Sequence, residues 1–446
     1  MSRKMKDSGV KWIGEIPSHW EVRKLKSIAK RITDYVASGS FASLNKNVTY
    51  LDEPDYAMLV RTVDLSKKTN KKPIYINKHA YDFLSNSNLF GGELILPNIG
   101  SVGSVYYFEP MYKRSSLAPN AILVDMKGIN KFFYYLFLSP LVSNALKHLG
   151  NDAVQEKFNK TQLRQFKVIN PPIEEQQKIA NFLDEKVSQI DTIIEKTKQS
   201  IEELKKYKQA LITETVTKGL DPNVEMKDSG IEWVGEIPKH WEIRRLRDIS
   251  IITRGTVDKS KEKNEIPVYL VQYTNVYYKR EQKINDDDYL PITVSENEYK
   301  KYKVRKGDIL LTASSETKDD IGHSTVIVED LPNHVFGSDI IRIRIPNKIV
   351  DLNYKKYFME NYYYLAKFDK LSRGITRFRF GMDQFKSLKY VIPPIEEQVK
   401  IAKYLDNITN HINQLICNKE KLINELESYK KSLIYEYVTG KKEHSC

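Results

Sequence analysis

The chain carries a long internal repeat, and no other feature of the sequence constrains its fold as strongly. A block that begins at Met5 and runs Met-Lys-Asp-Ser-Gly-Val-Lys-Trp-Ile-Gly-Glu-Ile-Pro-Ser-His-Trp-Glu returns, little changed, at Met226. A second block, Pro-Pro-Ile-Glu-Glu-Gln, begins at Pro171 and returns at Pro393. Self-similarity of this kind indicates one structural unit that is built twice. The 446 residues are long enough to give each copy its own hydrophobic core.

Between the two blocks, each half of the chain predicts a mixed globular domain. Short runs of alternating apolar and polar residues are separated by Gly, Pro and Asn, which is typical of strands and turns. Each half contains a glycine-acid strand, which begins at Gly92 in the first half and at Gly307 in the second. Each half then has an aromatic-rich segment, residues 131–149 and 354–371, that predicts a helix.

Each half ends in a segment that predicts a long helix. Residues 173–217 and 395–438 contain no Gly or Pro, and a Pro-Pro pair precedes each segment. At 1.5 Å per residue, about 45 residues form a helix of about 65 Å. Apolar residues spaced three and four apart predict a coiled-coil seam, at Ile190, Ile193, Ile201, Leu204, Tyr207 and Leu211 in the first helix and at Ile408, Ile412, Leu415, Leu422, Leu426, Tyr429 and Leu433 in the second. Such a seam needs a partner.

We expect the two long helices to pack antiparallel on each other, although pairing with another molecule stays an alternative. The predicted fold class is therefore α+β, with two similar mixed α/β domains, separated by two long antiparallel coiled-coil helices and related by a pseudo-twofold internal repeat. The expected boundaries place the first domain in residues 1–170 and the first helix in 171–220. The second domain then covers 221–392 and the second helix 393–446.

The charge of the chain favours an anionic partner. Lys and Arg number 71 against 58 Asp and Glu, which gives a net charge of +13. This excess indicates nucleic acid or an acidic membrane surface, unless it merely reflects a lysine-rich composition. Cys417 and Cys446 are too few for a disulfide framework or a thiolate zinc site. The longest apolar run, residues 132–138, is too short for a membrane span and the N-terminus lacks a secretory signal, so we expect a cytoplasmic protein.

The duplicated motifs together resemble one known family. The Trp-Ile/Val-Gly-Glu-Ile-Pro-x-His-Trp-Glu block, the glycine-acid strand and the Pro-Pro-Ile-Glu-Glu-Gln helix start are similar to the DNA-specificity (S) subunit of type I restriction–modification systems. The resemblance covers essentially the whole chain, in the family's order of target-recognition domain, helix, target-recognition domain, helix.

The resemblance also implies a function and partners. A non-catalytic subunit of this family binds double-stranded DNA with an asymmetric bipartite target, one half-site per target-recognition domain. It implies two modification (methyltransferase, M) subunits docked on the helices, joined by restriction/translocase (R) subunits. S-adenosylmethionine, ATP and Mg²⁺ would then belong to the partners, with no cofactor in this chain.

Catalytic alternatives find little support in the residues. The run Asn170-Pro-Pro-Ile resembles the Asn-Pro-Pro-aromatic motif of amino-methyltransferases, but Ile replaces the aromatic residue and the second copy lacks Asn. The loop at Gly100 lacks the Gly-Lys-Ser/Thr of a phosphate-binding loop. The acidic run at Asp286 has no counterpart in the first half, and His19 and His240 are better explained as packing and hydrogen-bonding residues. We therefore predict no catalytic and no metal site; a stand-alone DNA-binding scaffold and an enzyme, either nuclease or methyltransferase, remain the alternatives.

Candidate DNA contacts come from polar side chains that can read base edges or bind phosphates. The strongest stretch is residues 372–380, where three arginines alternate with aromatic residues; the first half has residues 151–157 in the matching position. The alternative is an edge strand with solvated arginines. The predicted contacts are Arg61, Asn98, Ser101, Ser104, Asn151, Gln155 and Lys157 in the first half and Gln272, Tyr273, Thr312, Ser314, Ser315, Lys318, Arg373, Thr376, Arg377 and Arg379 in the second.

Overall fold

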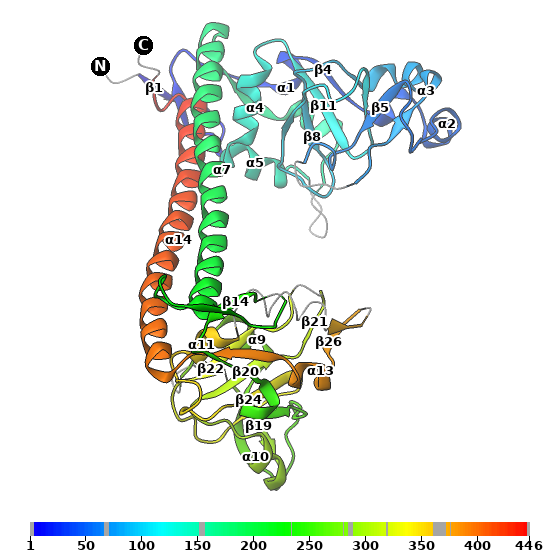
Figure 1. Cartoon of the computed structure of the whole chain (residues 1–446). Coiled ribbons are helices and arrows are strands. Elements are labelled where there is room, and N and C mark those ends of the chain that lie inside the picture. Colours follow the sequence, from blue (N-terminus) through cyan, green and yellow to red (C-terminus); the bar gives the residue numbers. More distant parts are fainter. Residues whose placement is uncertain are drawn as a thin grey trace. The chain divides into compact units, whose positions relative to one another are not determined.

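The computed structural model of the chain forms two compact units (Figure 1). Unit 1 comprises Met1–Thr197 with Glu420–Cys446, and unit 2 comprises Lys198–Lys419. Each unit therefore holds part of both long helices. The structure describes residues 4–66, 71–150, 157–232, 234–279, 281–283, 289–317, 320–359, 372–374 and 376–443.

Unit 1 contains two four-stranded sheets and two two-stranded ladders. The hairpin of β1 (Met5–Asp7) and β2 (Glu15–Pro17) and the ladder of β3 (Glu21–Lys24) with β12 (Lys167–Asn170) contain the repeated block and the strand before the long helix. One sheet has the order β4 (Ala29–Asp34), β11 (Ala121–Met126), β8 (Leu94–Pro97), β9 (Tyr106–Tyr107). The other has the order β6 (Tyr75–Ile76), β5 (Ala57–Val60), β10 (Ser115–Leu117), β7 (Asn88–Leu89). The short helices are α1 (Leu25–Ile28), α2 (Phe41–Asn47), α3 (Lys78–Phe83), α4 (Asn130–Leu138), α5 (Pro140–Lys147) and α6 (Lys160–Gln165), with 3-10 turns at Tyr35–Ser38 and Ser85–Ser87.

Among its described residues, unit 2 repeats this plan with one five-stranded and two three-stranded sheets. The hairpin of β13 (Met226–Asp228) and β14 (Glu236–Pro238) and the ladder of β15 (Glu242–Arg245) with β27 (Lys389–Ile392) match those of unit 1. The main sheet has the order β16 (Ile251–Arg254), β24 (Ile340–Arg344), β20 (Asp308–Thr312), β22 (Ser324–Ile327), β18 (Glu281–Gln282). Two three-stranded sheets follow the orders β19 (Leu290–Val294), β17 (Ile266–Val271), β23 (His334–Phe336) and β21 (Ser314–Ser315), β26 (Phe378–Phe380), β25 (Ser372–Arg373). The helices are α8 (Leu246–Ile249), α9 (Tyr273–Tyr278), α10 (Glu296–Tyr302), α11 (Lys355–Phe358) and α13 (Met382–Lys386).

The glycine-acid motif closes the turn that enters the central strand of each main sheet. In unit 1 the buried Glu93 carboxylate accepts hydrogen bonds from the N–H groups of Phe90 and Gly91, both at 2.8 Å. In unit 2 the buried Asp308 accepts from the Arg305 N–H at 2.8 Å. The acid therefore satisfies backbone donors that the turn would otherwise leave buried and unpaired.

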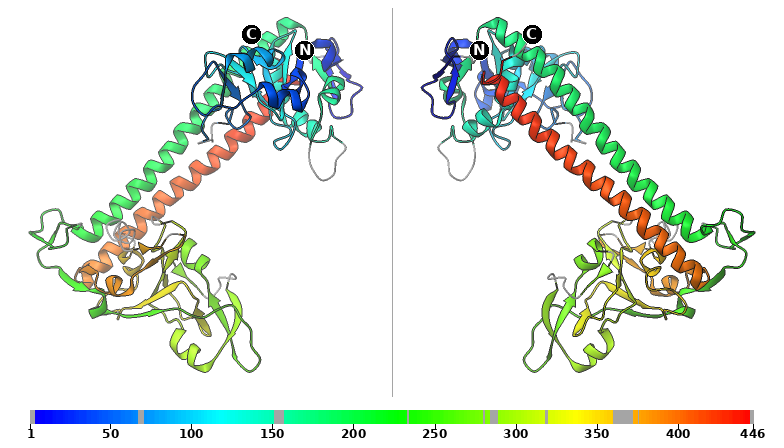
Figure 2. Two further views of the ribbon diagram at one scale, coloured as in Figure 1. Left: turned by 90° about the vertical axis from the view of Figure 1, so that its right-hand side faces the viewer. Right: turned by 90° about the vertical axis from the view of Figure 1, so that its left-hand side faces the viewer.

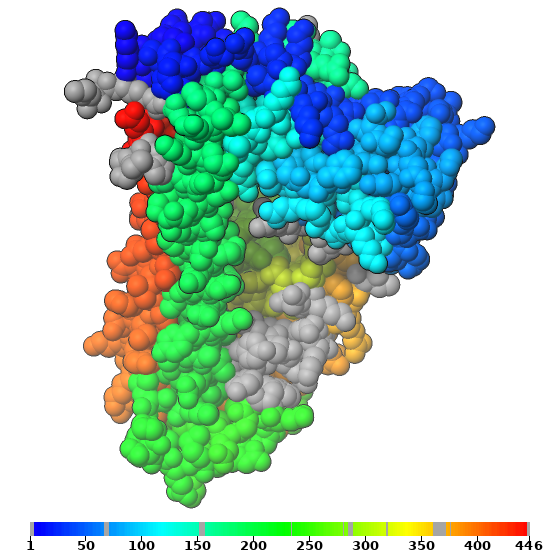
Figure 3. Space-filling model, turned by 90° about the horizontal axis from the view of Figure 1, so that it is seen from above, coloured from blue at the N-terminus to red at the C-terminus, as the bar shows by residue number. Residues whose placement is uncertain are grey.

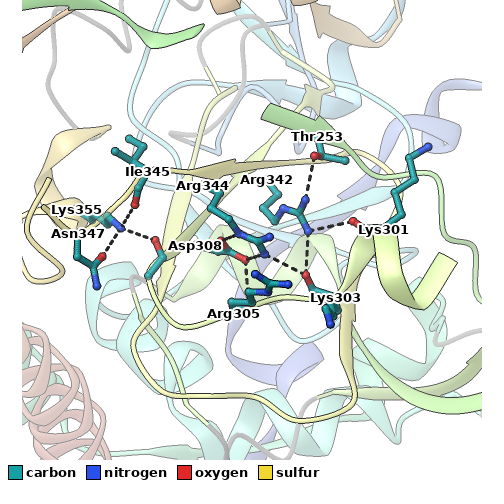
Figure 4. Close-up of polar contacts among 11 residues, drawn as sticks. Thr253, Lys301, Lys303, Arg305, Asp308, Arg342, Arg344, Ile345, Asn347 and Lys355 are labelled. Atoms are coloured by element: carbon teal, nitrogen blue, oxygen red, sulfur yellow. Dashed lines mark hydrogen bonds and ion pairs between the residues drawn. The ribbon is translucent and has the colours of Figure 1, made fainter. Parts of the chain in front are cut away.

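Unit 2 surrounds Asp308 with buried cations (Figure 4). Arg344 binds the Asp308 carboxylate with Nε at 2.6 Å and Nη2 at 2.7 Å. The Nζ of Lys355, which is 1% exposed, donates to the Gly307 and Ile345 carbonyls at 2.8 and 2.7 Å and to Asn347 Oδ1 at 2.7 Å. Burial lowers the pKa of Lys355 to about 8, because desolvation disfavours its charged form.

A second buried cation of the same network satisfies backbone groups next to the sheet. Arg342 donates to the carbonyls of Lys301 and Lys303 at 3.1 and 2.9 Å and to the Thr253 hydroxyl at 3.0 Å. Its burial lowers its pKa to about 10. The network therefore fixes the main sheet of unit 2 and lies inside the domain.

The two long helices are continuous. Helix α7 spans Ile173–Lys218 and α14 spans Ile395–Val438. In unit 1 the first part of α7 packs against the last part of α14, with Asp191 and Lys430 paired at 2.5 Å. In unit 2 the last part of α7 packs against the first part of α14, and Lys208 donates to Asn413 Oδ1 at 2.8 Å. Figures 1 and 2 show the helices side by side in each unit. The predicted α+β fold with antiparallel long helices is confirmed.

The predicted seam is partly out of phase with the buried face. Of the predicted positions, Ile190, Ile201, Ile412 and Leu433 are buried and Leu204, Leu211, Ile408 and Leu426 are half-buried. The prediction is wrong for five residues that are 41–56% exposed, namely Ile193, Tyr207, Leu415, Leu422 and Tyr429.

Polar residues that occupy part of the seam explain some of these errors. The buried stripe of α7 includes Thr197, whose hydroxyl donates to the Ile193 carbonyl at 2.7 Å, and the half-buried Lys208. In α14 it includes the half-buried Lys430, which pairs across to α7. Beside Tyr207 and Tyr429 the seam position is therefore a lysine. Beside Ile193, Leu415 and Leu422 it is another isoleucine, Ile194, Ile416 or Ile423, so there the predicted register is one residue out of place.

The repeated block anchors both long helices in each unit. In unit 1 the buried Trp20 donates from Nε1 to Glu175 Oε2 at 3.0 Å, and His19 Nε2 lies 2.6 Å from Glu175 Oε1. Glu175 belongs to the first turn of α7. Gly440, just beyond α14, packs against Trp20 and Pro17. Figure 3 shows the red last turns of α14 close to the blue N-terminal segment.

Unit 2 contains the same anchor. Trp241 Nε1 donates to Glu397 Oε2 at 3.0 Å and His240 Nε2 lies 2.6 Å from Glu397 Oε1, while Gly219 at the end of α7 packs against Trp241. The side chains of His19 and His240 are 48% and 45% exposed, so the structure supports the hydrogen-bonding part of their expected role rather than packing.

One predicted helix is split. Residues 131–149 were expected to form a single helix, but α4 ends at Leu138 and α5 begins at Pro140. A proline at the first helical position starts a new helix and disfavours helical geometry in the residue before it. In the parallel prediction, residues 354–371, the structure describes only α11 and the residues next to it. No described helix is long and apolar enough to cross a membrane.

Candidate nucleic-acid interface

In unit 2 the fold brings two predicted contact segments together. Strand β21, which follows the glycine-acid strand in the chain, pairs with β26, so that Ser314 lies opposite Arg379 and Ser315 opposite Phe378. Strand β25 pairs with β26 on its other side, and Gly374 takes a φ of 145° next to it. Residues about 60 positions apart in the chain, Ser314 and Arg377, therefore share one surface, with Arg377 Nε 3.3 Å from the Ser314 hydroxyl.

This surface is concave. One cavity of about 620 Å³ is lined by residues from α9, β21 and the β25–β26 hairpin, namely Tyr273, Thr274, Tyr277, Tyr278, Ser314, Ser315, Glu316, Asp320, Thr376 and Arg377. A neighbouring cavity of about 210 Å³ shares Tyr273, Thr274 and Arg377 and adds Lys259, Gln272 and Asp339 among others. Six predicted contact residues, Gln272, Tyr273, Ser314, Ser315, Thr376 and Arg377, therefore line these two cavities.

Arg379 of β26 and Arg377, which lies just before this strand, flank the carboxylate of Asp339. Arg377 Nη2 lies 2.7 Å from Asp339 Oδ2, and Arg379 Nη2 lies 3.7 Å from Asp339 Oδ1. Both arginine side chains remain about half exposed, at 53% and 50%. Because successive side chains of a strand alternate between faces, Arg377 and Arg379 share a face. Of the two, Arg377 lines the larger cavity, together with the acidic residues Glu316 and Asp320.

An aromatic wall of the cavity was missed from the sequence. In α9 the rings of Tyr273 and Tyr277 stack at 5.8 Å, and Tyr278 is 78% exposed. The Tyr277 hydroxyl donates to Asp320 at 2.9 Å, and this hydrogen bond raises the pKa of Tyr277. His323 Nε2 lies 2.9 Å from the same carboxylate. The signal was present as three tyrosines within residues 273–278, of which only Tyr273 was among the predicted contacts.

In unit 1 the matching segments also meet. Ile99 forms a bridge with Lys157. The Asn98 amide donates to the Phe158 carbonyl at 3.1 Å, and the Phe158 N–H donates to the Asn98 carbonyl at 3.2 Å. Ser101 is exposed and Ser104 is half-buried in the same loop. Asn98, Ser101, Ser104 and Lys157 thus form one loop surface in unit 1.

Comparison with known proteins decides the family. The model of the type I restriction modification DNA specificity domain matches residues 17–204 and again residues 238–428. The chain belongs to this family. Both copies of the family domain lie at the repeat found in the sequence, so the internal duplication is a duplication of the specificity domain.

Relatives and solved structures agree with this assignment. A protein named as the type I restriction enzyme MjaX specificity subunit of Methanocaldococcus jannaschii is 28% identical and aligns over 96% of this chain and 95% of its own length. The EcoKI specificity subunit of Escherichia coli K12 is 22% identical over 65% of this chain and 62% of its own length. The prediction of a specificity subunit rather than an enzyme is confirmed on this ground.

Solved structures of low identity show the same fold. A chain from a structure of a type I restriction–modification system, described in terms of complex assembly and conformational transition, has a TM-score of 0.71 and 13% identity over 96% of this chain and 99% of its own. The HsdS subunit of Thermoanaerobacter tengcongensis has a TM-score of 0.52 and 13% identity over 96% of this chain and 98% of its own.

Within this specificity-domain fold, three of the predicted DNA contacts form hydrogen bonds inside the protein instead. Thr312 is fully buried, and its hydroxyl accepts a hydrogen bond from the Gly322 N–H at 3.2 Å. Arg61 donates to the Asp64 carboxylate at 2.6 and 2.8 Å and to the Lys72 carbonyl at 2.7 Å. The Gln272 side chain caps α9 by accepting from the backbone of Asn275. The prediction of a direct contact is wrong for Thr312, and also for Ser314 and Ser315, which are only 1% and 6% exposed, because a buried hydroxyl cannot reach DNA.

The remaining predicted contacts are Arg373, which is exposed on β25, and three residues that lie outside the described part of the chain, Asn151, Gln155 and Lys318. The acidic run that begins at Asp286 lies outside it as well. Among the described residues, no group of three or more His, Cys, Asp or Glu could hold a metal ion.

The methyltransferase-like Asn170 is part of a helix start. Its side-chain oxygen accepts from Gln176 Nε2 at 3.3 Å, and the same Nε2 donates to the Pro171 carbonyl at 2.8 Å. In the second copy Gln398 donates to the Pro393 carbonyl at 2.8 Å without any Asn. The Pro-Pro motif therefore fixes the entry of the chain into the long helix, as its position before the helix suggested.

Proposed function

We propose that this chain is a non-catalytic specificity subunit that reads an asymmetric bipartite sequence in double-stranded DNA, with one half-site per unit. The observation that carries this proposal is that both units bring the same two chain segments together but equip them differently. Unit 2 presents Arg377 and three tyrosines around two cavities, with the buried Ser314 behind Arg377. Unit 1 presents a loop with Asn98, Ser101 and Lys157. Two identical readers would select a palindrome, whereas two different readers select two different half-sites.

The long helices supply the second part of the proposal. The paired helices α7 and α14 would act as a spacer between the half-sites and as the docking element for two modification subunits, which restriction/translocase subunits would join. S-adenosylmethionine, ATP and Mg²⁺ would be bound by those partners, in the cytoplasm. Support comes from the exposed apolar residues that the helix pair carries outside its seam, such as Tyr207, Leu415 and Tyr429.

Genome-wide mapping of N6-methyladenine tests this function. Cells that express the chain together with its modification subunit should gain methylation at one asymmetric motif made of two short half-sites and an unread gap. Cells with the modification subunit alone should lack this motif. Methylation of the same motif without the chain, or methyltransferase or nuclease activity of the purified chain alone, would refute the proposal.

A stand-alone DNA-binding scaffold predicts a different result. In that case the chain would purify without any methyltransferase partner, and its expression would leave the methylome unchanged. Purification of the full chain from its native cells, followed by identification of bound subunits, therefore separates the two functions.

A further inference from the structure

The concave surface of unit 2 contains an unusual carboxylate. Asp339 lies just before β24 with a φ of 63°, and its side chain is only 20% exposed. A carboxylate repels DNA phosphates, so at a surface that binds DNA it needs a compensating purpose. The Asp339 carbonyl accepts from the Ala313 N–H at 2.8 Å, which ties this residue to the end of β20. Asp339 is therefore a fixed anion with Arg377 as its closest partner.

The contacts of Arg377 define which part of its guanidinium group is available. The side edge of the group, formed by Nε and Nη2, is used by the Ser314 hydroxyl at 3.3 Å and the Asp339 carboxylate at 2.7 Å. Within the described part of the chain, Nη1 has no hydrogen-bond partner. Each Nη carries two hydrogens, so the end of the group, formed by Nη1 and the second hydrogen of Nη2, is left for a ligand. The side chain is 53% exposed.

A planar, end-on pair of donors matches one base edge in the major groove. Guanine presents two acceptors there, O6 and N7, and arginine binds both at once, whereas adenine presents one acceptor and one donor. Two contacts that already hold the guanidinium group also reduce the rotamer entropy that binding would cost. We propose that Arg377 reads a guanine in the half-site of unit 2, and that Asp339 and Ser314 are positioning residues that hold it for this contact.

Arg379 has the chemistry for a different task. It shares the face of Arg377 and is equally exposed, but its distance to Asp339 Oδ1 is 3.7 Å, which is too long for a hydrogen bond. A half-exposed, weakly paired cation suits a phosphate, which offers charge but no sequence information. Arg379 therefore serves as a matched control, because its substitution removes the same charge from the same strand.

The inference rests on the proposed function, and one experiment separates the two. Methyladenine is mapped in cells that express the modification subunit with the wild-type chain or with Arg377→Ala, Arg377→Lys, Asp339→Asn or Arg379→Ala, each at equal chain abundance. In the wild type, one half-site should contain a guanine or its paired cytosine at a sharply defined position. Arg377→Ala and Arg377→Lys should broaden that position alone, with a loss of preference for guanine of roughly 5- to 150-fold.

The positioning role has its own readout. Asn tolerates the left-handed conformation of position 339 and keeps an acceptor, but it lacks the charge. Asp339→Asn should therefore broaden the same position while affinity for unrelated duplex DNA, measured by titration of the purified complex, stays equal or rises. A purely structural ion pair would instead leave base preference unchanged. Arg379→Ala should lower methylation at all sites together and keep the motif.

Each outcome has a clear meaning. An unchanged motif in both Arg377 variants, broadening at a position without guanine or cytosine, or identical effects of Arg377→Ala and Arg379→Ala would overturn the inference and leave the proposed function standing. If both Arg377 variants abolish methylation, Asp339→Asn provides the test, because an unchanged motif in that variant would also contradict the inference. Absence of any chain-dependent motif in the wild type would refute the proposed function itself.

Discussion

The duplicated anchor between the repeated block and the long helix makes a quantitative prediction about stability. In Glu397→Ala the Trp241 indole N–H loses its acceptor while its side chain stays 1% exposed. A buried donor without a partner costs about 1–3 kcal/mol. The contact between Glu397 and His240 is about one-third to one-half exposed, so its loss adds at most about 1 kcal/mol. The expected loss of unfolding free energy is therefore about 1–4 kcal/mol.

The repeat provides the control for this prediction. Glu175→Ala removes the same two contacts from unit 1, where Trp20 is equally buried. Urea unfolding of the full chain measures the loss of stability. Hydrogen exchange with peptide resolution should then show weaker protection around Trp241 in Glu397→Ala and around Trp20 in Glu175→Ala. Glu397→Gln should retain most of the stability, because its amide oxygen still accepts from the indole. A loss below about 0.5 kcal/mol in both alanine variants would show that the anchor does not stabilise the units.

Three further predictions concern the helices and the buried network. Ile194→Ala, at a 5% exposed position, should cost about 2–5 kcal/mol, whereas its exposed neighbour Ile193→Ala should cost under about 1 kcal/mol; equal losses in thermal unfolding would contradict the observed seam. Burial lowers the pKa of Lys355 from 10.5 to about 8, so the unfolded chain binds this proton more tightly than the folded chain does. The unfolding free energy relative to Lys355→Met should therefore rise by about 3 kcal/mol between about pH 8 and 10.5. Parallel pH profiles of the two proteins in urea titrations would refute this. Four residues inserted into α7 add about 6 Å, which is comparable to two base-pair steps, so the methylated motif should keep both half-sites and change its gap; an unchanged gap would exclude the spacer role.

The parts of the fold that sequence alone predicts are those that local chemistry determines. The Pro-Pro starts and the absence of Gly and Pro define the long helices within a residue or two of α7 and α14. The pairing of strands could not be predicted in the same way, because it depends on partners far apart in the chain. An example is the parallel pairing of β5 with β10, whose residues Met58 and Ser115 lie 57 positions apart.

The site shows the same division. Arg377 and Ser314 were both predicted contacts, since their type and setting mark them as readers of DNA. Their closeness could not be predicted, nor could the part played by Asp339, because only the fold brings this carboxylate to Arg377. Polar residues were overpredicted for a related reason: Thr312 and Gln272 have the right chemistry, but their hydrogen bonds stabilise the protein itself.

Comparison of the two copies separates the scaffold from the reading surface. The Trp–Glu anchor recurs in both units, and so does a hydrogen bond of 2.6 Å from a tyrosine of the domain to an aspartate of the long helix, Tyr135 to Asp184 in unit 1 and Tyr357 to Asp406 in unit 2. The Trp and Tyr side chains of these hydrogen bonds are buried, so a change in either partner alone lowers stability, and loss of the carboxylate leaves a buried donor unpaired. At the proposed reading surface the copies differ, because the partners of a residue such as Arg377, namely Asp339 and Ser314, belong to the domain itself and not to the long helices. A unit can therefore acquire a new reading surface, such as the Arg377 hairpin, while the anchors that attach it to α7 and α14 stay the same.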